Sequence, residues 1–171
     1  MKASLQSKLE QLALRREELE RLLADEAQLP RPVAGRDDAA EREMSAARRA
    51  QALELIRAAR RRWSFLLEHI DEPLAPLRDA LAGLGLAHLR ERLDERLASE
   101  PDATLFRVLQ DRTIRVSWKA EVRAPLEKIF SGLAFAPLLD AVDAIHRKVL
   151  RGRVFVALHM HAGDGNVHTN I

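Results

Sequence analysis

The sequence contains no cysteine and no long apolar run, and these two absences exclude several classes of protein. Without thiols, the chain cannot form disulfides, thiolate zinc sites or iron–sulfur clusters, so any metal chemistry must use histidine and carboxylate ligands. No run of about 18 apolar residues predicts a membrane span, and residues 1–8 lack the apolar core of a signal peptide. The sequence therefore predicts a cytoplasmic protein without a membrane span.

A strong excess of charge of one sign is also lacking. The chain has 28 Lys and Arg against 26 Asp and Glu, which leaves a formal net charge of +2. The arginines at positions 60–62 carry positive charge that could bind phosphate. However, Glu54 and Glu68 lie on the same predicted helix, and no interleaved aromatic residues are present to stack on bases. This pattern favours a solvated helix face, and we expect no nucleic-acid partner.

The first hundred residues carry helical patterns interrupted by proline and glycine. Leucines recur at steps of three and four residues in the first segment, which is typical of an amphipathic helix. Pro30, Pro32 and Gly35 then interrupt the pattern, and further apolar stripes predict helical hairpins up to residue 103. The predicted segments are an amphipathic helix over residues 1–29, a linker over 30–38 and a helical insertion over 39–103.

The pattern changes in the last segment, residues 104–171. Apolar and polar residues alternate over 114–122, which predicts a strand with one exposed face, although a helix remains an alternative because Leu105, Val108 and Leu109 step helically into it. Helices are predicted over 125–130 and 137–150, and the apolar run at 154–158 predicts a buried strand. The expected fold class is therefore α+β, with helical hairpins followed by a strand-helix-strand unit that ends in a β-hairpin.

The hairpin carries the residues most typical of a functional site. Asp164 and Gly165 form a favoured two-residue turn, which would place His161 directly opposite His168. Cross-strand Cβ atoms lie about 4.5 to 5.5 Å apart, close enough for two imidazoles to share a divalent ion. His159 and Asn170 would lie on the same face, and the third protein ligand of a catalytic site is either His159 or missing from this chain. The alternative is a pair of hydrogen-bonded core histidines without a metal.

These residues resemble a motif of the FAD-linked oxidases of the vanillyl-alcohol-oxidase type, which include D-lactate and D-2-hydroxyglutarate dehydrogenases. The family motif His-x-Gly-Asp-Gly-Asn-x-His is matched by residues 161–168. The resemblance implies that His161 and His168 bind a divalent metal, zinc or manganese, and that Asn170 lies on the substrate side. His159 is a hypothetical catalytic base that accepts the proton of a substrate hydroxyl.

The resemblance extends over residues 117–130 and 153–171 to a bacterial branch of FAD/FMN-containing dehydrogenases. Residues 104–171 then correspond to part of the substrate domain, while the flavin domain and a later Glu-His segment have no counterpart here. We therefore expect a fragment of a flavin-dependent 2-hydroxy-acid dehydrogenase. Its FAD would be bound by the missing flavin domain, and its partners would be a small 2-hydroxy acid and the rest of the flavoenzyme.

Two other functions fit parts of the sequence. The helical stripes before residue 100 are also typical of a non-enzymatic helical interaction protein. Residues 1–23, with the run Lys-Leu-Glu-Gln-Leu at positions 8–12, resemble the first helix of peptide chain release factor one, which implies a role in translation. That resemblance covers one amphipathic helix, and no Gly-Gly-Gln motif follows it.

Overall fold

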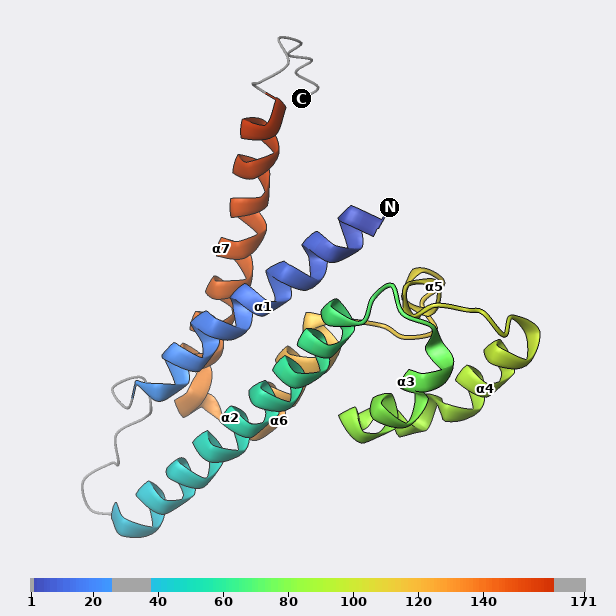
Figure 1. The fold of residues 1–171 in the computed structure, drawn as a ribbon. Helices are drawn as coiled ribbons and strands as arrows, with labels where there is room; N and C mark the ends of the chain where they lie inside the picture. The colour runs from blue at the N-terminus through green and yellow to red at the C-terminus, as the bar shows by residue number, and fades with distance from the viewer. Residues whose placement is uncertain (1, 26–37, 162–171) are drawn as a thin grey trace.

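The computed structural model describes residues 2–25 and 38–161, and all regular secondary structure in these ranges is helical (Figure 1). One isolated antiparallel bridge joins Pro73 to Thr104. The predicted α+β class is therefore wrong for the described part of the chain, which is built from helices. The α-helices are α1 (Lys2–Ala24), α2 (Asp38–Glu68), α3 (Leu74–Leu81), α4 (Arg90–Ser99), α5 (Leu105–Gln110), α6 (Ala124–Ile129) and α7 (Ala136–His161). Shorter helical turns are η2 (Ala82–Leu86), η3 (Ala87–Leu89), η4 (Lys119–Arg123) and η5 (Leu133–Phe135).

Helices α1, α2 and α7 together contribute to one part of the core. Helix α1 packs along α2 and crosses α7, and α6 lies against α2 (Figure 1). Leucines at helical spacing on α1 meet a stripe on α2 that includes the fully buried Trp63, and burial of each such side chain contributes about 1.5 to 3 kcal/mol. The buried residues of the two stripes are Leu9, Leu12, Leu19 and Leu23 on α1, and Ala52, Ile56, Ala59, Trp63 and Leu66 on α2.

The short helices α3, α4 and α5 form a second layer at one end of α2 (Figure 1). Helix α3 begins directly after Pro73, because proline fixes the backbone before a helix and needs no amide partner. Backbone hydrogen bonds from Leu74 to Ala103 (2.8 Å) and from Leu105 to Glu72 (2.9 Å) join the start of α3 to the start of α5. The segment 69–74 is thus held beside 103–106.

The predicted strand over residues 114–122 is only partly realised as an extended chain. Residues 115–117 have no regular structure, and from Trp118 onward the chain is helical through η4 and α6. Ile114, Val116 and Trp118 are buried while Arg115 is exposed, so the alternation reports an extended segment that packs on one side. The strand prediction is wrong because this segment forms no ladder with another strand in the described residues.

The predicted strand over residues 154–158 is also wrong, because α7 continues as one helix of 26 residues to His161. Branched and aromatic residues favour a strand locally, but an extended segment needs a neighbouring strand to satisfy its amide and carbonyl groups. A helix satisfies these groups within the segment itself. The predicted hairpin turn at Asp164 and Gly165 lies outside the described residues.

The predicted division into segments 1–29, 30–38, 39–103 and 104–171 stays a prediction. Within the helices that the structure describes, none is both long and apolar enough to cross a membrane.

Candidate functional site

The predicted site residues all belong to the end of α7 or follow it. His159 and His161 lie in the last turn of α7, and their side chains are outside the described part of the structure. His168 and Asn170 lie outside the described residues as well. The structure therefore neither brings these four residues together nor separates His161 from His168. Among the described side chains, no group of three metal-ligating residues is found.

The helical state of α7 does change the relation between His159 and His161. In a strand, two residues separated by one position point to the same face. In a helix they leave the axis about 200° apart, because each residue turns by about 100°. Because residues 159–161 are helical, the strand geometry on which a shared face for His159 and His161 was predicted is absent there.

A cavity of about 670 Å³ has a lining that mixes apolar and polar side chains. It lies between the start of α1, helix α5, the extended segment 111–118 and the middle of α7. Its apolar lining residues are Leu5, Phe106, Leu109, Ile114, Val116 and Trp118, and its polar lining residues are Lys8, Gln110, Arg112, Arg115, Ser117, Lys119 and His146.

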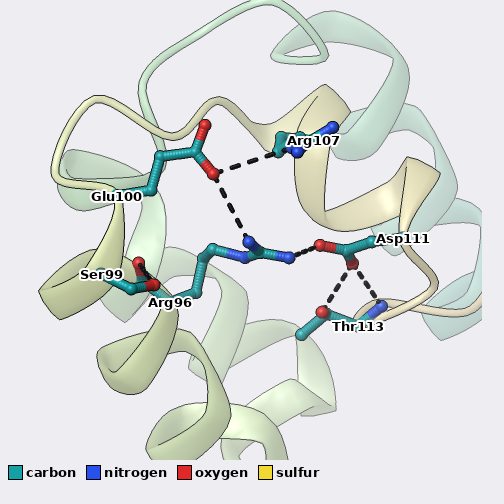
Figure 2. Close-up of polar contacts among 6 residues, drawn as sticks. All are labelled: Arg96, Ser99, Glu100, Arg107, Asp111 and Thr113. Carbon is teal, nitrogen blue, oxygen red and sulfur yellow. Dashed lines mark hydrogen bonds and ion pairs between the residues drawn. The ribbon is translucent and has the colours of Figure 1, made fainter.

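A polar network fixes the turn at one edge of this cavity (Figure 2). The Asp111 carboxylate accepts hydrogen bonds from the backbone amide (2.9 Å) and hydroxyl (2.6 Å) of Thr113, and its other oxygen pairs with the Arg96 guanidinium. Because Arg96 lies on α4, its pair with Asp111 ties the turn to that helix, and Arg96 also pairs with Glu100 at 3.4 Å. The network thereby holds Arg112 at a φ of 66°, a left-handed conformation that is uncommon for residues other than glycine.

Glu121 anchors the opposite end of the extended segment to α2. Its carboxylate accepts hydrogen bonds from Arg62 Nε at 2.8 Å, from Trp63 Nε1 at 3.2 Å and from the backbone amide of Ser117 at 2.9 Å. The Glu121 and Arg62 side chains are only 15% and 17% exposed, so these charge-assisted bonds form in a region shielded from water. Together with Asp111, Glu121 fixes both ends of the cavity wall.

Two aromatic rings meet at the wall of the cavity. The indole of Trp118 and the imidazole of His146 on α7 are stacked, and the Arg15 guanidinium of α1 lies 5.9 Å from the indole centroid. Burial lowers the pKa of His146, and the positive charge of Arg15 lowers it further, whereas the Asp143 carboxylate opposes the shift. His146 is therefore held toward its neutral form.

Trp118 Nε1 and His146 Nδ1 are buried without a hydrogen-bond partner in the described structure. A buried donor that lacks a partner is uncommon, because leaving it unsatisfied costs about 1 to 3 kcal/mol. Both residues line the cavity.

Sequence reasoning missed this cavity. Arg115 and Lys119 were interpreted as the exposed face of a strand, and no local signal connects them with Lys8 or His146, which are distant in sequence. The alternation at 114–118 correctly indicated a segment with one apolar, buried side and one exposed side. Only the packing of α1 and α7 completes the cavity.

Comparisons with protein families, curated proteins and solved structures find no match to this chain.

Proposed function

We propose that this chain is a segment of a flavin-dependent 2-hydroxy-acid dehydrogenase and that it contributes metal and substrate ligands from the residues at and after the end of α7. The observation that carries this proposal is the run His-Ala-Gly-Asp-Gly-Asn-Val-His at residues 161–168. It agrees with the FAD-linked oxidase motif at every specified position.

In this proposal His161 and His168 hold a zinc or manganese ion, and Asn170 contacts a small 2-hydroxy acid. A divalent ion at two imidazoles supplies a Lewis acid for the hydroxyl and carboxylate oxygens of the substrate, while FAD bound by the rest of the flavoenzyme supplies the hydride acceptor. His159 is not proposed as a third ligand, because the strand geometry that would place it on one face with His161 is absent from α7. Its role as a proton acceptor stays a prediction, as does a cytoplasmic location.

Calorimetric titration of the purified chain with zinc and with manganese tests the proposal. We expect binding near one equivalent that is lost in a His161→Ala, His168→Ala double variant. The matched control is His69→Ala with His88→Ala, which removes two histidines distant in sequence from the motif and should leave metal binding unchanged. Absence of binding by the folded wild-type chain, or equal loss in both double variants, would contradict a metal site in residues 161–168.

A helical interaction protein is the second candidate, and the helical fold favours it. All regular structure in the described ranges is helical, and Leu14, Met44 and Leu133 are exposed apolar side chains on it. A helical interaction protein has no reason to bind zinc at one equivalent, so thermal unfolding with and without equimolar zinc separates the two candidates. Stabilisation by zinc that requires His161 and His168 supports the dehydrogenase proposal, and its absence supports the helical interaction protein.

A further inference from the structure

The cavity between α1, α5, segment 111–118 and α7 is bordered by charges of one sign. Its charged lining residues are Lys8, Arg112, Arg115 and Lys119, and no carboxylate lines it. None of these four side chains forms an ion pair with a carboxylate of the described residues. Other basic residues of this protein do find such partners, as Arg62 does with Glu121 and Arg123 does with Asp143. The positive charge at this cavity is therefore available to an anion.

The wall behind these charges is apolar and well ordered by its contacts. Leu109, Ile114 and Trp118 are at most 6% exposed, and Phe106 packs beside them. The Asp111 network and the three bonds to Glu121 hold the extended segment at both ends, so the wall is formed before any ligand arrives. A preformed apolar wall lowers the entropic cost of binding.

We propose that this cavity binds an amphipathic organic anion. Its acidic headgroup is held by Arg112, Arg115 and Lys119, and its apolar body lies against the wall that includes Trp118. This site is independent of the metal proposal, because none of its lining residues belongs to the motif at 161–168. A free inorganic anion uses only the charged border of the cavity.

The size of the cavity agrees with a ligand of this class. Small-molecule sites commonly enclose about 300 to 1,000 Å³, with apolar walls and a few polar groups that set orientation. At about 670 Å³ the cavity accommodates a chain of roughly ten carbons with its headgroup. Burial of each methylene strengthens binding, since each contributes about 0.8 kcal/mol on transfer from water. The site should therefore select long over short tails.

Calorimetric titration of the full chain with four probes tests this site. The probes are decanoate, decyl phosphate, butanoate and decyltrimethylammonium, each kept below the concentration at which it forms micelles. We expect saturable binding of one or both ten-carbon anions near one equivalent, with weak binding of butanoate and of the cation. The tighter of decanoate and decyl phosphate identifies the headgroup as carboxylate or phosphate.

Two double variants locate the binding on the chain. Arg112→Gln with Arg115→Gln should weaken binding of the ten-carbon anion by at least about tenfold, because two charge-assisted contacts are lost. Arg92→Gln with Lys128→Gln removes two exposed positive charges that do not line the cavity and should change the affinity less than about twofold. No saturable binding of either anion, equal binding of the cation, or equal effects of the two double variants would overturn the proposal.

Discussion

The Arg123 guanidinium donates two hydrogen bonds to the Asp143 carboxylate, with 2.7 Å from Nε to Oδ1 and 3.1 Å from Nη2 to Oδ2. This fork joins the end of η4 to the first half of α7 across 20 positions of sequence. Hydrogen bonding to Asp143 raises the pKa of Arg123, so Arg123 keeps its positive charge. The contact holds α7 against the segment that also carries Glu121.

Replacing Arg123 by lysine should lower the free energy of unfolding by about 1 kcal/mol, because lysine keeps the charge but cannot form the two-bond fork. The effect is modest, since the Arg123 and Asp143 side chains are 22% and 36% exposed and water screens the pair. Urea unfolding followed by circular dichroism measures it. Arg92→Lys, at an exposed position of α4, is the control and should unfold with wild-type stability. Equal midpoints for the wild type and Arg123→Lys would show that the fork does not stabilise the fold.

Glu121 should be far more sensitive to substitution. The Glu121→Ala variant leaves Arg62, Trp63 Nε1 and the Ser117 amide without their shared acceptor, in a region where the side chains are mostly shielded. We expect a loss of about 2 to 4 kcal/mol in the free energy of unfolding. Glu54→Ala is the matched control, because its carboxylate also pairs with an arginine, Arg61, at 2.8 Å but on an exposed helix face.

Chemical denaturation of both variants measures the difference. The Glu54→Ala midpoint should stay close to that of the wild type, since exposed ion pairs contribute little. Similar losses in the two variants would mean that burial of the Glu121 cluster does not strengthen it.

His146 should make stability depend on pH. Burial beside Trp118 and the charge of Arg15 lower the pKa of His146 in the folded protein, so the unfolded chain binds the additional proton more readily. Stability from this residue is therefore unaffected above the unfolded pKa of about 6.5 and falls as the pH decreases through that value toward the folded pKa. The His146→Gln variant should lose stability less steeply than the wild type between about pH 7 and pH 5.

Unfolding midpoints at a series of pH values check this prediction. His88→Gln, at an exposed position of η3, removes one histidine elsewhere and serves as the control. The comparison uses the slope of the unfolding midpoint against pH for each variant, because other groups of the protein also take up protons in this range. A slope for His146→Gln that matches those of the wild type and His88→Gln would contradict the lowered pKa.

Local signals in the sequence predicted much of the helical structure. The helix predicted over residues 125–130 is present as α6, although the chain is already helical from Trp118, and the helix predicted over 137–150 is present within α7. Both predictions rest on interactions within a few residues of the chain. They were confirmed because no distant partner is needed to form them.

Strand predictions failed where a strand is stable only beside a neighbouring strand. The run at residues 154–158 has strand propensity, but a buried strand is stable only when neighbouring strands accept its hydrogen bonds. The structure forms the helix α7 there instead. The cavity was unpredictable for a related reason, because Lys8 and His146 meet segment 111–118 only through packing of α1 and α7.

Gly152 gives a direct test of the helix at the end of α7. Glycine inside a helix costs about 0.5 to 1 kcal/mol relative to alanine, and valine is a weaker helix former than alanine but a stronger strand former. Because Gly152 lies within α7, Gly152→Ala should increase helix content and stability more than Gly152→Val does. Far-UV circular dichroism and thermal unfolding of both variants measure this order. The same two substitutions at Gly132, where φ is 113°, should both destabilise the protein, since side chains rarely adopt that conformation. Greater stability for Gly152→Val than for Gly152→Ala would indicate a strand at this position and contradict the helical end of α7.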